Sequence, residues 1–149
     1  MTVKPIPEGY HTVTPYLTVE GAAKLIDFLK QAFEAREIFC MTRPDGMIGH
    51  AEVRIGDSVV MMSEACGEWK PMPAMMHLYV EDVDAVYRHA LEKGATSLRE
   101  PIDQFYGDRS GGVRDLCGNH WWIATHKENL PPEELAKRAE AFWKQQSRG

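Results

Sequence analysis

The sequence contains few cysteines, and their arrangement does not point to a metal or disulfide scaffold. Its three cysteines are Cys40, Cys66 and Cys117, and no two of them form a CxxC pair. An odd number of cysteines at wide spacing predicts neither a disulfide framework nor a zinc knuckle. We therefore expect three unpaired thiols in a single small domain.

Positive charge is also scarce. The chain has 17 Lys and Arg against 22 Asp and Glu, which gives a formal net charge of −5 at pH 7. Nucleic-acid binding normally needs a basic surface, so we expect no nucleic-acid partner. No apolar run approaches the roughly 18 residues that span a bilayer, and the proline-containing start of the chain (Pro5, Pro7) has no apolar signal segment. These features predict a cytoplasmic protein without a membrane partner.

The common catalytic signatures are missing as well. The sequence has no GxGxxG, Walker, HExxH or GxSxG motif. The glycine-rich stretch 107–112 has no lysine and does not lead from a buried strand into a helix, so we expect it to be a loop between strands. Asp82 and Asp84 begin a predicted helix, where capping explains them better than paired-carboxylate catalysis.

The sequence does contain two rounds of the same periodicity. In the first half, alternation predicts strands and a three-to-four spacing predicts a helix, in the order strand 11–19, helix 21–35, and strands 36–43, 48–55 and 58–63. A linker rich in glycine and proline covers residues 64–74. The second half predicts strand 75–80, helix 82–95, and strands 96–105, 112–116 and 120–126.

The two halves correspond at a constant offset of 61 residues, the difference between Thr18 and Tyr79 and between Met61 and Trp122. This correspondence predicts an internal duplication. The predicted fold class is α+β, with two βαβββ modules (about 10–65 and 75–126) forming a cupped mixed sheet in a domain that covers 1–128. Residues 129–149 form a C-terminal helix whose apolar stripe packs on its own domain or on a partner subunit.

Several local strings carry a resemblance to a known family. They are TPYLTVEGAAKLIDF (14–28), GHAEVRIGDSVVMM (49–62), YVEDVDA (79–85), YGDR (106–109) and RDLCGNHWWIATH (114–126). Together they resemble the vicinal oxygen chelate superfamily, which includes glyoxalase I, bleomycin-resistance proteins and extradiol dioxygenases, and they look closest to its PhnB-like branch. The resemblance implies a cup formed by paired modules, often in a homodimer with exchanged units.

Metal-dependent members of this family place four ligands in the cup, one on the first and one on the last strand of each module. The resemblance carries these positions onto Thr14, Met61, Met75 and Trp122. A hydroxyl, two thioethers and an indole do not hold zinc, nickel or iron in such a site. We therefore predict no cofactor, and keep a divalent metal bound elsewhere as an alternative.

The same positions suggest a binding site for a small organic molecule. One interpretation is that Met61, Met75 and Trp122 provide an adaptable apolar floor, which suits a flat aromatic or amphipathic compound with a polar or anionic group. The other is that these large side chains simply fill the cup as core. The predicted ligand-binding residues are Thr14, Tyr16, His50, Glu52, Arg54, Met61, Met75, His77, Tyr79, Arg109 and Trp122. The first hypothesis is a homodimeric, metal-free binding protein.

Two other hypotheses remain open. His50, Glu52 and His77 face the predicted cup and offer a displaced metal site, which would make the protein a metal-dependent lyase, isomerase or dioxygenase. Alternatively these side chains are only polar lining, hydrogen-bonded to each other or to water. The third hypothesis is a degenerate module whose surface serves protein assembly.

Overall fold

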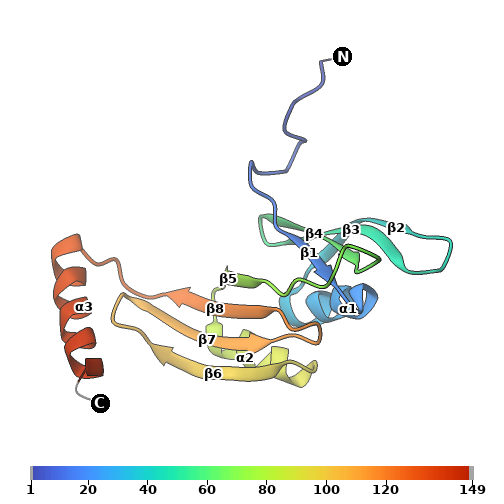
Figure 1. Cartoon of the computed structure of the whole chain (residues 1–149). Coiled ribbons are helices and arrows are strands. Elements are labelled where there is room, and N and C mark those ends of the chain that lie inside the picture. The colour runs from blue at the N-terminus through green and yellow to red at the C-terminus, as the bar shows by residue number, and fades with distance from the viewer. Residues whose placement is uncertain (1, 148–149) are drawn as a thin grey trace.

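The structure is a computed structural model that describes residues 2–147, with elements in the order βαβββ, βαβββ, α (Figure 1). The elements are β1 (Tyr16–Val19), α1 (Ala22–Phe33), β2 (Arg36–Thr42), β3 (Ile48–Ile55), β4 (Ser58–Glu64), β5 (Met75–Tyr79), α2 (Val83–Glu92), β6 (Thr96–Asp103), β7 (Asp108–Arg114), β8 (His120–His126) and α3 (Pro132–Ser147).

Each module forms its own four-stranded mixed sheet. Sheet one has the strand order β1-β4-β3-β2, and sheet two has the order β5-β8-β7-β6. In both, the first strand runs parallel to the fourth, with Tyr16 opposite Met61 in sheet one and His77 opposite Trp122 in sheet two. These pairs differ by the predicted 61 residues, which confirms the duplication and the α+β class.

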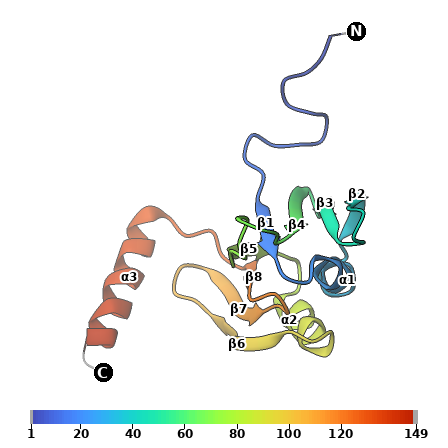
Figure 2. The ribbon, with the colours of Figure 1, turned by 45° about the vertical axis from the view of Figure 1, so that its right-hand side comes forward.

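The hydrophobic core lies between the sheets and their helices. Ala51, Val53 and Ile55 alternate along β3 on the side of α1 and are buried, as the sequence pattern predicts. Helices α1 and α2 pack against each other between the modules (Figure 2). Phe33 at the end of α1 contacts Trp121 of β8 with ring centroids 5.1 Å apart, so the two modules share one core.

The duplication extends to the way each helix begins. The backbone N–H of Ala22, the first residue of α1, donates to the Glu64 carboxylate at 3.0 Å. The N–H of Val83, the first residue of α2, donates to Thr125 Oγ1 at 2.9 Å. Both acceptors stand on the last strand of their module, again 61 residues apart, so each sheet satisfies an N–H that its helix cannot pair internally.

The first strand is shorter than the sequence pattern predicts. It begins at Tyr16 rather than at residue 11, and Val13 is 83% exposed. The Pro15 carbonyl accepts from the Met61 N–H at 2.9 Å, but proline has no N–H to donate, and the ladder goes no further. Residues before β1 form an arm that leads away from the body of the molecule (Figure 1).

The predicted loop over 107–112 is also wrong. Strand β6 ends at Asp103 and β7 already begins at Asp108, because a tight turn with Gly107 at φ 99° closes the hairpin. The Gln104 N–H donates to the Asp108 carbonyl at 2.7 Å. The glycines at 111 and 112 therefore lie inside a strand, where alternation cannot be read from their side chains.

The buried carboxylate of Asp115 organises the turn between β7 and β8. It accepts from the backbone N–H groups of Cys117 and Asn119 at 2.8 and 3.0 Å, and from the Trp121 indole N–H at 2.8 Å. Asn119 is fully buried, and its side-chain oxygen accepts from the Ala74 N–H at 3.0 Å. The turn thereby fixes both the linker before β5 and the tryptophan at the centre of the core.

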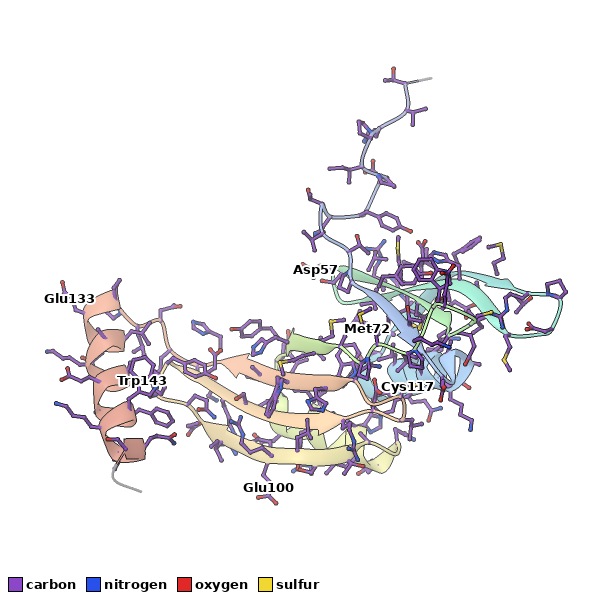
Figure 3. The ribbon with its side chains drawn as sticks, in the orientation of Figure 1. Asp57, Met72, Glu100, Cys117, Glu133 and Trp143 are labelled. Carbon is purple, nitrogen blue, oxygen red and sulfur yellow. The ribbon has the colours of Figure 1, made fainter. Side chains whose placement is uncertain are left out.

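Helix α3 stands apart from the rest of the chain. Phe142 packs on Phe105 of the β6–β7 turn with ring centroids 4.8 Å apart, and Arg138 pairs with Glu128 at 2.9 Å. No described residue of α3 is buried, and Trp143 is 64% exposed on the side that faces the sheets (Figure 3). Within residues 2–147, no helix has the length and apolar character that a membrane crossing requires.

Replacing Asp115 by Ala should lower the free energy of unfolding by about 3 kcal/mol, because it leaves more than one buried N–H donor without an acceptor. Urea denaturation followed by tryptophan fluorescence measures this change. The control is Asp57→Ala on the exposed β3–β4 turn (Figure 3), which should alter stability little. Equal effects of the two substitutions would contradict the role assigned to Asp115.

Candidate functional site

The first candidate surface is the face of sheet one opposite α1, which we name wall one. Register pairing places Tyr16, Met61, Glu52 and Phe39 in one row across β1, β4, β3 and β2. Tyr16 and Phe39 are each 49% exposed. Wall one consists of Tyr16, Phe39, His50, Glu52, Arg54 and Met61, and all of these except Phe39 are predicted site residues.

The polar groups of wall one form a connected chain. Tyr16 Oη lies 3.0 Å from His50 Nδ1, and His50 Nε2 lies 2.8 Å from Glu52 Oε2. The Tyr10 hydroxyl donates to the other oxygen of Glu52, and Arg54 donates to the Gly9 carbonyl at 3.2 Å. The arm before β1 is therefore fastened across the edge of this wall.

These contacts determine the ionisation of Glu52. Desolvation raises the pKa of its carboxyl, but hydrogen bonds from Tyr10 and His50 favour the charged form more strongly, so the pKa lies below its ordinary value. The hydrogen bond to Glu52 in turn raises the pKa of Tyr10. Wall one therefore presents a carboxylate at neutral pH, with both oxygens already engaged by neighbouring side chains.

The second surface is the face of sheet two opposite α2, which we name wall two. Its central row runs from His77 through Trp122 and Gly112 to Arg99, across β5, β8, β7 and β6. His77 contacts Tyr79 edge to face with ring centroids 4.8 Å apart. The side chains of wall two come from Met75, His77, Tyr79, Arg99, Asp108, Ser110, Trp122 and His126.

A second polar chain closes one end of wall two. Asp108, 5% exposed, accepts from the Tyr79 hydroxyl at 2.9 Å and lies 2.7 Å from His126 Nδ1. The hydrogen bond to Asp108 raises the pKa of Tyr79, and hydrogen bonds to Asp108 and then Asn129 raise the pKa of His126. An imidazolium at position 126 would balance the buried carboxylate.

Two predicted site residues lie away from these walls. Arg109 is on the opposite face of β7, where Nε and Nη2 donate to the two oxygens of Asp84 at 2.8 and 3.0 Å. It is part of a strand and held against α2, rather than reaching from a loop. Thr14 lies in the arm before β1, and its hydroxyl contacts the His11 carbonyl at 3.5 Å.

The predicted set of site residues leaves out several that the structure places on or beside the walls. They are Tyr10, Phe39, Arg99, Asp108 and His126. Asp108 would have been found by extending the alternation of β7 back to its true start. Arg99 lies inside the predicted strand 96–105, but irregular pairing on both sides of it in β6 obscures which face it occupies. Tyr10 comes from an arm whose course no periodicity describes.

Within one chain the two walls do not meet. No hydrogen bond, ion pair or ring contact joins wall one to wall two in the part of the chain that the structure describes. The alternative metal site is divided in the same way, since His50 and Glu52 lie on sheet one and His77 on sheet two. Residues 2–147 contain no group of three His, Cys, Asp or Glu side chains that could hold a metal ion.

The positions that the resemblance assigns to metal ligands do not suit a metal. Met61 lies on wall one, and Met75 and Trp122 lie on wall two, while Thr14 is in the arm. Thioether sulfur and an indole are poor ligands for zinc, iron or nickel beside a single hydroxyl. This donor set does not fit the chelating metal of the family.

A groove of about 1300 Å³ lies along β5 at the junction of the modules. Arg54 of wall one and His77 and Tyr79 of wall two border it. Apolar side chains of both modules complete its lining, among them Phe33, Ile55, Met76, Leu78 and Val86. Because β5 is an edge strand of its sheet, the groove also borders unpaired backbone groups.

Comparison with known proteins agrees with this architecture. TioX from Micromonospora sp. ML1 superposes with a TM-score of 0.68 at 23% identity, covering 78% of this chain and 98% of TioX. A PhnB protein from Bacillus cereus superposes with a TM-score of 0.60 at 16% identity, covering 77% of this chain and 99% of the other. At these identities the likeness shows the fold alone.

Sequence comparison identifies relatives and the family. The uncharacterized protein Mb0911c of Mycobacterium bovis is 40% identical over 135 residues, covering 83% of this chain and 88% of its own length. The model of the Glyoxalase/Bleomycin resistance protein/Dioxygenase superfamily matches residues 10–123. Since this match covers most of the chain and both βαβββ modules, the chain belongs to the glyoxalase/bleomycin resistance protein/dioxygenase superfamily.

Proposed function

We propose that this protein is a cytoplasmic, PhnB-like homodimer that binds a small aromatic or amphipathic molecule without a metal at the family's usual positions. The observation that carries the proposal is the composition of the two walls. Where metal-dependent members of the family place ligands, this chain has Met61, Met75 and Trp122, surrounded by tyrosine and histidine rings. Large polarisable and aromatic side chains around a few polar groups suit a flat organic ligand.

The exposure of the walls supports the proposed homodimer. Tyr79 is 61% exposed and Met75 is 68% exposed in the single chain. Apolar surface of this kind is usually covered in the working assembly. In the proposed dimer, wall one of each copy faces wall two of the other, and two equivalent cups result.

The strings that resemble the PhnB-like branch and the superposition on a PhnB protein support the assignment to that branch. The three unpaired cysteines support a reducing compartment such as the cytoplasm.

The oligomeric state tests the shared cup directly. Light scattering coupled to size-exclusion chromatography should give twice the 16.9 kDa mass of the chain, at concentrations from micromolar upward. A monomer over that whole range would contradict a cup built from two copies.

Ligand binding depends on Trp122 in this proposal. Calorimetry with a panel of planar aromatic compounds should identify at least one binder, and Trp122→Leu should weaken its affinity about tenfold or more through loss of the ring face. Trp143→Leu on α3 is the matched control and should leave the affinity unchanged. Loss of binding in the control but not in Trp122→Leu would place the ligand elsewhere.

Metal content distinguishes this proposal from a metal-dependent enzyme. After incubation with zinc, nickel, manganese or iron(II) and desalting, elemental analysis should find far less than one metal ion per chain. Near-stoichiometric metal would contradict the proposal. If His77→Ala then removed that metal, the metal-free proposal would give way to a metal site formed by His50 and Glu52 of one copy and His77 of the other.

A further inference from the structure

Arg99 occupies a distinctive place on wall two. Its side chain comes from β6 and is partly buried, and Nη2 donates to the Ser110 carbonyl at 2.7 Å and to Ser110 Oγ at 2.6 Å. When the Gln104 side-chain amide is oriented with its oxygen toward Arg99, that oxygen accepts from Nη1 at 3.0 Å. The buried Nε–H of Arg99 has no acceptor. The guanidinium is therefore held firmly while one of its donors stays unused.

Arg99 also lacks the charge partner that three other arginines have. Arg43, Arg109 and Arg138 each pair with at least one carboxylate at 3.3 Å or less. Among the described residues, no carboxylate lies within 4.0 Å of Arg99. Arginine cannot lose its charge inside a protein, and a partly buried cation without a counter-charge is costly. An anion from outside the chain would remove that cost.

An aromatic surface lies directly beside this cation. The Arg99 guanidinium carbon is 5.2 Å from the centroid of the Trp122 ring. That ring lies across Gly112, where any Cβ would come within 2.4 Å of Trp122 Cζ3. A glycine at position 112 therefore allows the indole to lie close to the sheet, next to Arg99. His77 follows Trp122 in the same row, so the charged group stands at the end of an aromatic surface.

We infer that Arg99 binds the anionic group of the ligand, and that the ligand is a planar aromatic carboxylate whose ring lies on Trp122. This inference rests on the proposed function and narrows its ligand class. A carboxylate supplies the counter-charge that Arg99 lacks, through a charge-assisted hydrogen bond with the guanidinium. The buried Nε–H lies out of reach of a ligand and is not part of this contact.

A matched pair of probes tests the inference. Naphthalene-2-carboxylate and naphthalene-2-carboxamide share ring and shape and differ in charge. Calorimetry on the wild-type protein should show the carboxylate binding at least about tenfold more tightly. Arg99→Gln should abolish this preference and leave the affinity for the carboxamide nearly unchanged. The control Arg43→Gln removes a surface arginine already paired with Asp45 and should keep the preference.

Each other result has a defined meaning. Equal affinities in the wild type, or a preference that survives in Arg99→Gln, would overturn the inference while the proposed function stands. Binding of neither probe to the wild type would overturn both. If Arg99→Gln dissociates the dimer, the counter-charge of Arg99 is a carboxylate of the second copy, and the inference fails. Arg99→Lys keeps the charge without the planar guanidinium and should retain part of the preference, which provides a second variant if the glutamine variant does not fold.

Discussion

The hydrogen bonds of Asp115 are the constraint on which much of the molecule depends. A single buried carboxylate fixes the β7–β8 turn and orients the Trp121 indole, and Trp121 then packs on Phe33 from the other module. The Cys117 thiol in the same turn donates to the Glu20 carbonyl at 3.3 Å, at the junction of β1 and α1. This turn thus helps to set the position of one module relative to the other, and with it the direction in which each wall faces.

The two modules share an architecture but differ in chemistry. Glu64 and Thr125 each accept a hydrogen bond from the first backbone N–H of a helix, although the Glu64 side chain is charged and the Thr125 side chain is neutral. The walls differ more. Each wall carries a carboxylate held by neighbouring side chains, Glu52 on wall one and Asp108 on wall two. Their arginines differ, since Arg54 donates to the Gly9 carbonyl of the arm, whereas Arg99 donates to Ser110. The Arg99 guanidinium also lies beside the Trp122 ring, so the cation of wall two borders a large aromatic surface.

The sequence predicts the elements well where side chains alternate clearly. Strands β3 and β8 have the predicted bounds, 48–55 and 120–126, because large apolar residues alternate with polar ones between recognisable turns. Prediction failed where that signal is missing. The adjacent glycines at 111 and 112 carry no side-chain alternation, so the true start of β7 at Asp108 was not recognised. Arg109 therefore lies in a strand and not in a loop, and its side chain points to the face covered by α2.

The site was predicted less completely than the fold, for a physical reason. Periodicity identifies which residues share a face, and it placed His50, Glu52, His77 and Trp122 on the outward faces. It does not describe how two sheets are oriented, since that depends on packing between α1, α2 and Trp121. Nor does it describe the path of an irregular arm, and so Tyr10 was not expected beside Glu52.

The contact between Gly112 and Trp122 has an evolutionary consequence. A side chain at 112 is compatible with this backbone only when the residue at 122 is smaller, and a large ring at 122 requires glycine at 112. Substitutions at positions 112 and 122 are therefore coupled, and among descendants of this chain they should occur together. A lineage that exchanges both at once would replace the aromatic floor of wall two, and with it ligand preference, while keeping the sheet intact.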